Sequence, residues 1–122
     1  MITDNKLTFK EESSYRKDGF LVRENIFSKT EVVKINDALE RAASKALLLS
    51  KTGTVYHLDG KRFVDSDYLT VQFEPGLDSE TIRVIEPAHQ LDKELKELTE
   101  DPRLVGPIQN IIGMKSISLW TD

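Results

Sequence analysis

The chain has 122 residues, of which 39% are hydrophobic and 31% charged, a balance typical of a folded domain rather than a disordered segment. The net charge of -4 and the lack of any long run of Lys and Arg argue against a nucleic-acid partner, and the absence of cysteine excludes disulfides and thiolate chemistry. Residues 1–14 are polar and charged and do not predict a secretory signal, and no apolar run is long enough to cross a bilayer. We therefore expect one cytoplasmic domain with no membrane contact.

The first predicted elements are a short helix and a brief strand. Residues 8–18 have helical spacing that directs Phe9 and Tyr15 inward, and Gly19 suits the left-handed conformation that ends a helix. Residues 20–22 are apolar and predict a brief strand.

A long amphipathic helix is the clearest predicted element. Ser28 and Glu31 have the Ser-x-x-Glu spacing of a capping box, and the pattern runs to about Ser50 or Lys51. The predicted packed face consists of apolar residues at steps of three and four: Val32, Ile35, Leu39, Ala42, Ala46 and Leu49. The residues expected in solvent are Lys34, Asp37, Glu40, Arg41 and Lys45. Since the face has no Met or aromatic cluster, we expect a scaffold helix packed on a sheet rather than a ligand-binding stripe.

Strand signals follow this helix. Residues 55–58 and 61–64 flank Asp59-Gly60, a dipeptide typical of a type I′ hairpin turn. Residues 68–74 alternate between apolar and polar and predict a strand or an extended segment, and residues 81–86 predict a further strand.

Helical signals return before a final strand. Residues 90–99 place Leu91, Leu95 and Leu98 on one side, and Asp101-Pro102 starts a second helix that ends at Gly113. The apolar face of this second helix is Val105, Ile108, Ile111 and Ile112, and Gly106-Pro107 inside it predicts a short helix. Ile117 and Leu119 then alternate with polar residues and predict a strand with one apolar face.

His57 and Asp59 form the most specific candidate for metal chemistry. Residues two apart on a strand point to the same side, so a His-x-Asp pair supplies two thirds of the facial triad that binds non-haem iron. His89 is the other histidine. The hairpin turn already explains Asp59, however. His89 lies just before a predicted helix, and nothing in the sequence predicts that it lies near His57. We therefore assign no metal ligand here.

Arg83 is the candidate for anion binding, because a guanidinium on a strand can bind a carboxylate through two hydrogen bonds. Its neighbours Ile82 and Val84 should point to the opposite face of the strand. For an isolated arginine, a solvated or salt-bridged surface position is the favoured alternative.

Three stretches together resemble the N-terminal portion of the phytanoyl-CoA dioxygenase family of non-haem iron oxygenases. They are residues 15–28 with the long helix after them, residues 82–89 with the later helix from Asp101 to Gly113, and the terminal strand from Ile117 to Asp122. The resemblance implies an α+β fold in which residues 1–122 form a single partial domain. That domain would contain the N-terminal helices and first strands of a double-stranded β-helix (jelly roll), incomplete.

The resemblance also implies an activity, which is Fe(II)- and 2-oxoglutarate-dependent hydroxylation of a small organic or acyl substrate. In that family the His-x-Asp pair follows the strand that residues 119–122 resemble. The metal ligands are therefore expected beyond Asp122, and neither Fe(II) nor 2-oxoglutarate is expected on this chain alone, which we expect to be inactive. Arg83 lies on a strand from which a basic residue approaches 2-oxoglutarate in such enzymes, so the resemblance implies a cofactor-binding role for it.

The competing hypothesis is a small non-catalytic interaction module. In this alternative the strand from Ile117 to Trp120 adds to the sheet of a partner through its open edge. The substrate and the oligomeric state are open at this stage.

Overall fold

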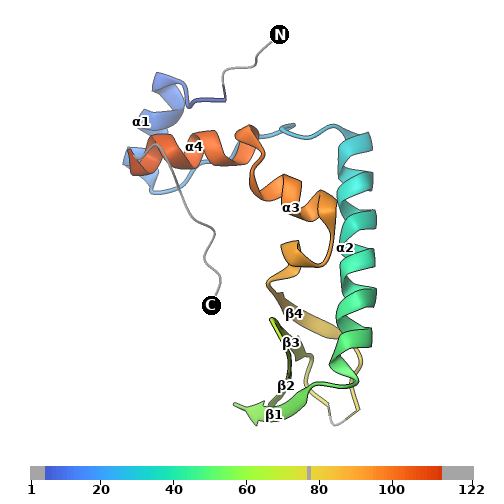
Figure 1. The fold of residues 1–122 in the computed structure, drawn as a ribbon. Helices are drawn as coiled ribbons and strands as arrows, with labels where there is room; N and C mark the ends of the chain where they lie inside the picture. The colour runs from blue at the N-terminus through green and yellow to red at the C-terminus, as the bar shows by residue number, and fades with distance from the viewer. Residues whose placement is uncertain (1–4, 77, 114–122) are drawn as a thin grey trace.

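The computed structural model describes residues 5–76 and 78–113. In chain order its elements are α1 (Phe9–Asp18), α2 (Lys29–Ser50), β1 (Thr54–Leu58), β2 (Lys61–Ser66), β3 (Leu69–Phe73), β4 (Ile82–Glu86), the 3-10 helix η1 (Ala88–Gln90), α3 (Lys93–Thr99) and α4 (Pro102–Ile112). Helix α2 runs along one side of the molecule, with the sheet beside its C-terminal half and α4 near its N-terminal end (Figure 1). Its 22 residues span about 33 Å at 1.5 Å per residue.

The capping box predicted for α2 is confirmed. Ser28 Oγ accepts a hydrogen bond from the backbone N–H of Glu31 at 3.2 Å, and Glu31 Oε2 accepts one from the Ser28 N–H at 2.7 Å. Two of the N–H groups that every helix start leaves unpaired are therefore satisfied locally. The helix ends at Ser50, as predicted.

The packed face of α2 differs in part from the predicted one. The fully buried residues are Ala38, Ala42 and Ala46, whereas Val32 and Leu39 are 44% and 46% exposed. Alanines along the line of contact allow the helix backbone to lie close to the sheet, and the larger side chains are displaced to the flanks. The prediction was therefore right for Ala42 and Ala46, and wrong for Val32 and Leu39.

The sheet is an antiparallel meander with the strand order β1-β2-β3-β4. The hairpin predicted around Asp59-Gly60 is confirmed, since Leu58 pairs with Lys61 and both turn residues have positive φ angles. Strand β3 alternates as predicted, with Leu69, Val71 and Phe73 buried. Strand β4 is also confirmed, within one residue of its predicted start.

One apolar core joins α2 to the sheet and to the segment that leads into α3. Its buried hydrophobic members are Ala38, Ala42, Ala46, Val64, Leu69, Val71, Phe73, Leu91 and Leu95. The scaffold role predicted for α2 agrees with this arrangement. The fold is α+β within the described residues, and its extension into a jelly roll stays a prediction.

Helix α1 has the predicted bounds but not the predicted packing. Thr8 and Glu11 form a second capping box, and Gly19 adopts φ +79° at the C-terminus, as expected. Phe9 is 86% exposed, so its inward placement was wrong. Phe9 and Tyr15 are six residues apart, which puts them about 120° apart around the helix, so no single face could bury both.

The strand predicted over residues 20–22 is absent from the described structure, where these residues belong to no helix or strand. Three residues gain little from extended geometry unless a ladder of hydrogen bonds forms. Phe20 and Val22 accordingly remain mostly exposed.

The later helices agree with the prediction apart from their bounds. Helix α3 begins at Lys93 rather than near Gln90, because the Asp92 side chain caps it by accepting from the N–H groups of Glu94 and Leu95. Helix α4 begins after the Asp101 N-cap, as predicted, and spans 11 residues despite Pro107. Its apolar face is largely uncovered, with Ile108, Ile111 and Ile112 between 40% and 53% exposed.

The strand predicted over residues 117–120 lies outside the described residues. Within residues 5–76 and 78–113, no helix combines the length and the apolar character needed to cross a bilayer.

Candidate functional site

Arg103 in the first turn of α4 is the most connected side chain in the described structure. Its Nη1 donates to Glu31 Oε1 at 2.7 Å and to the carbonyl oxygen of Ile26 at 3.4 Å. Its Nε and Nη2 donate to the two carboxylate oxygens of Asp101 at 3.0 and 2.8 Å. The guanidinium also lies 4.3 Å from the centre of the Phe27 ring. Arg103 therefore fastens the start of α4 to the start of α2 and to the segment before α2.

The electrostatics of this cluster stabilise the charged form of every member. Hydrogen bonds from Arg103 hold the pKa of Asp101 below its usual value. The pKa of Glu31 is lowered first by the backbone N–H of Ser28 and then by Arg103. The two carboxylates in turn raise the pKa of Arg103. Most of the five guanidinium N–H groups have protein acceptors, so the role that the contacts assign to Arg103 is to join elements.

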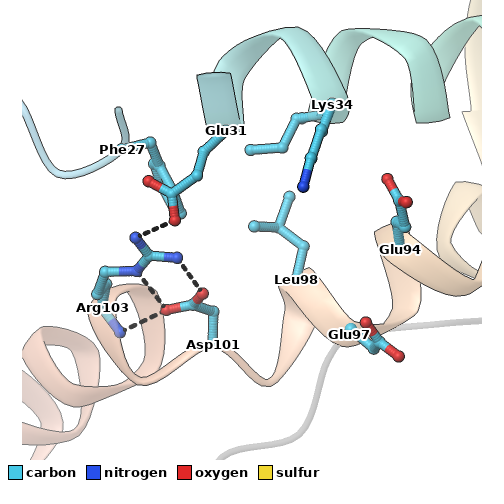
Figure 2. A pocket seen from close by; sticks show the side chains of 9 residues that line it. Phe27, Glu31, Lys34, Glu94, Glu97, Leu98, Asp101 and Arg103 are labelled. Atoms are coloured by element: carbon cyan, nitrogen blue, oxygen red, sulfur yellow. Dashed lines mark hydrogen bonds and ion pairs between the residues drawn. The ribbon is translucent and has the colours of Figure 1, made fainter. Parts of the chain in front are cut away.

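A pocket of about 230 Å³ opens beside this cluster, between α2 and the helices α3 and α4 (Figure 2). It is lined by Phe27, Glu31, Lys34, Ile35, Glu94, Glu97, Leu98, Asp101 and Arg103. The Lys34 amine points into the pocket above Leu98 (Figure 2). Glu94 and Glu97 pair with Arg41 and Lys93 at 3.5 and 3.7 Å. The pocket combines an apolar floor with a lysine that has no ion-pair partner among the described residues.

A second hollow, of about 570 Å³, shares Phe27 and Arg103 with the first pocket. Its lining comes from the segment before α2 and from α4: Leu21, Arg23, Asn25, Ile26, Phe27, Val32, Arg103, Leu104, Pro107 and Ile108. Arg103 therefore lines both hollows.

Arg83, the predicted 2-oxoglutarate contact, lies on β4 and lines neither of these pockets. The strand has an irregularity here, because Phe73 pairs with Ile82 and Gln72 with Val84, which leaves Arg83 as the extra residue of a β-bulge. Simple alternation does not hold at a bulge, so the predicted opposition to both neighbours fails locally. The side chain is exposed and bonds to no other described residue, which leaves it available to an anion.

The histidines do not assemble with carboxylates in the described structure. His57 is exposed on β1 and Asp59 occupies the hairpin turn with φ +51°, as the turn interpretation required. His89 lies in η1, which follows β4 and precedes α3. No group of three or more His, Asp or Glu side chains among residues 5–76 and 78–113 could hold a metal ion. These residues therefore do not fit an iron site.

Sequence reasoning missed the residues that join the elements. Arg41 and Lys45 are exposed, as predicted, but Arg41 Nε also donates to Asp92 Oδ2 at 2.8 Å and Lys45 to the carbonyl oxygen of Leu91 at 2.8 Å. Asp92 is buried, and the Arg41 hydrogen bond lowers its pKa. Only the capping roles of Glu31 and Asp101 were predicted from the sequence, because they depend on local spacing.

Arg62 on β2 is a further residue without a sequence signal. Its guanidinium lies 4.0 Å above the Phe73 ring and donates to the carbonyl oxygen of Ser79. The contact ties the loop between β3 and β4 to the sheet. Its buried Nε has no acceptor among the described residues.

Comparison with known proteins gives two informative matches. The ectoine dioxygenases of Bordetella parapertussis and Bordetella bronchiseptica are each 29% identical to the chain over 107 residues. The match covers 88% of this chain but 29% of each relative, so the chain spans less than a third of their length. No family model and no solved structure matches the chain significantly. The matches support a relationship to dioxygenases, whereas membership of the phytanoyl-CoA dioxygenase family stays a prediction.

Proposed function

We propose that this chain is the N-terminal segment of a phytanoyl-CoA dioxygenase-like oxygenase that depends on Fe(II) and 2-oxoglutarate. The observation that carries the proposal is the 107-residue match to two ectoine dioxygenases, which extends over 88% of the chain. Bound together, iron and 2-oxoglutarate activate dioxygen for the hydroxylation of an unactivated C–H bond. The substrate class in this proposal is a small organic or acyl compound.

The described residues have a supporting role in this proposal. Helix α2 covers one face of the sheet through its alanines, and the Arg41 and Arg103 contacts hold α3 and α4 against it. Such an arrangement fixes the sheet on which the remainder of an oxygenase would be built. In this proposal the metal ligands lie outside residues 1–122, so the chain alone is expected to be inactive.

Arg83 is the residue of this chain that we place near 2-oxoglutarate. It is an exposed guanidinium with no partner among the described residues, at a β-bulge that turns its side chain out of the regular alternation. A planar guanidinium matches the two oxygens of a carboxylate, which is the group that 2-oxoglutarate offers at each end.

A chimera tests the proposal. The matched segment of the Bordetella parapertussis ectoine dioxygenase would be replaced by the corresponding residues of this chain, and Fe(II)-dependent consumption of 2-oxoglutarate would be measured. We expect turnover in the chimera, and we expect Arg83→Ala to raise the 2-oxoglutarate concentration needed for half-maximal rate. Arg16→Ala in α1 is the matched control, because it removes an exposed arginine far from the sheet.

Two results would count against the proposal. A folded chimera without any iron-dependent turnover would remove its main support. Submicromolar binding of Fe(II) to the chain by itself, abolished by His57→Ala, would indicate a self-contained site instead.

The alternative of an interaction module keeps one specific support in the described structure. Its predicted strand, residues 117–120, lies outside the described residues, but β1 offers an open edge within them.

A further inference from the structure

Strand β1 is the least covered part of the sheet. It stands at the end of the strand order and pairs only with β2 among the described strands. All five of its residues are exposed, including Val55 at 51% and Leu58 at 57%. An exposed apolar edge strand is a template for pairing with another strand.

The opposite edge of the same sheet is protected. Strand β4 carries the charged residues Arg83 and Glu86, contains a β-bulge, and is followed at once by Pro87. Charge, bulges and proline are the devices that natural proteins use to prevent edge pairing. Strand β1 has none of the three, since its sequence is Thr-Val-Tyr-His-Leu and its pairing with β2 is regular.

The hairpin turn determines which backbone groups β1 presents outward. Leu58 and Lys61 close a two-residue turn, so they form a hydrogen-bonded pair, and hydrogen-bonded residues then alternate along the strand. Thr54, Tyr56 and Leu58 therefore bond to β2. Val55 and His57 point their N–H and C=O groups toward the free edge.

We propose that β1 pairs antiparallel with β1 of a second copy of this chain, with Tyr56 on the two-fold axis. In this register each Val55 lies opposite His57 of the other copy, and the two residues exchange both backbone hydrogen bonds. The outward N–H and C=O groups of Val55 and His57 in each copy therefore all bond to Val55 and His57 of the other copy. This self-complementarity is what a two-fold interface requires.

The side chains support a second copy as the occupant. Strand β1 contains no Asp, Glu, Lys or Arg, so self-pairing brings no like charges together. On the face opposite α2, Tyr56 already stacks on Phe63 with ring centres 5.2 Å apart. Pairing about Tyr56 would place the two tyrosines side by side and form a row of four aromatic rings across the joined sheets.

Disulfide trapping tests the register directly, because the chain has no cysteine of its own. Residues on the axis form a non-hydrogen-bonded pair with Cα atoms about 4.5 Å apart, within the range that a disulfide spans. We expect Tyr56→Cys to give a disulfide-linked dimer under mild oxidation. Val33→Cys, at a 58% exposed position on α2, is the matched control and should cross-link far more slowly. Equal rates for the two variants would overturn the proposal.

Sedimentation equilibrium on the unmodified chain supplies the second test. We expect a reversible monomer–dimer equilibrium that Val55→Lys weakens by about tenfold or more, since a lysine on an edge strand blocks pairing. Val33→Lys adds the same charge elsewhere and should leave the equilibrium unchanged. A strictly monomeric chain, or a dimer indifferent to Val55→Lys, would refute the inference. The inference does not depend on the proposed oxygenase function.

Discussion

The packing of α2 on the sheet can be tested with two adjacent residues. Ala38 is fully buried and Leu39 is 46% exposed, whereas the periodicity of the sequence places Leu39 on the packed face. Ala38→Leu adds three carbon atoms where there is no free space, and overpacking of this kind costs about 1–3 kcal/mol. Leu39→Ala removes a side chain that is about half in solvent, so we expect a loss of about 1 kcal/mol or less.

Urea denaturation followed by far-UV circular dichroism measures both changes. The slope of the transition should stay constant, so that the midpoints report stability alone. In a chain of this size, 1 kcal/mol corresponds to about 3–5 °C in Tm, which makes the two variants distinguishable by heating as well. Leu48→Ala, at a 68% exposed position of the same helix, is the control for truncation of an exposed leucine.

The opposite ranking would refute the described packing. If Leu39 pointed into the core, its truncation would leave a cavity and cost about 2–5 kcal/mol. Ala38→Leu would then be nearly neutral, because the new side chain would extend into solvent.

Three further predictions concern contacts between the helices and strands. Hydrogen bonds from Arg41 and Arg103 lower the pKa values of Asp92 and Asp101 in the folded chain. The two carboxylates therefore contribute their full stabilisation above the unfolded pKa of about 3.9, and this stabilisation is lost as the pH falls through their folded pKa values. The urea midpoint should accordingly drop between about pH 5 and pH 2. Gly53→Ala should lower Tm, since the added Cβ would lie 2.5 Å from the backbone oxygen of Asp65; an unchanged or higher Tm would contradict this contact. Arg103→Gln should speed amide hydrogen exchange in α4 and leave β3 protected, whereas equal acceleration in both would mean that the whole fold had been weakened.

Local signals in the sequence predicted most element boundaries. The Ser28 and Glu31 box, the Asp59-Gly60 turn and the Asp101 cap each depend on residues a few positions apart, and each forms as expected. Such features depend on backbone chemistry that does not require the tertiary fold.

The packed face of α2 and the candidate site could not be predicted in the same way. Which stripe of a helix is buried depends on how closely the sheet approaches it, and that distance is set by the alanines together with the strands they meet. Two partners of Arg103, Glu31 and the carbonyl oxygen of Ile26, lie 72 and 77 positions away in the sequence, so no spacing rule reveals them. The bulge at Arg83 likewise interrupts the alternation from which its orientation was inferred.

The sheet and helix α4 are attached to the rest of the molecule by different kinds of interaction. The sheet half is joined to α2 by fully buried apolar side chains, whereas α4 has no buried residue and is positioned by directional contacts such as those of Arg103 and the hydrogen bond from the Leu7 N–H to Asn110 Oδ1 at 2.9 Å. Hydrogen bonds fix an orientation but contribute less net stability than the burial of a large side chain. Opening of α4 should therefore require less free energy than unfolding of the sheet.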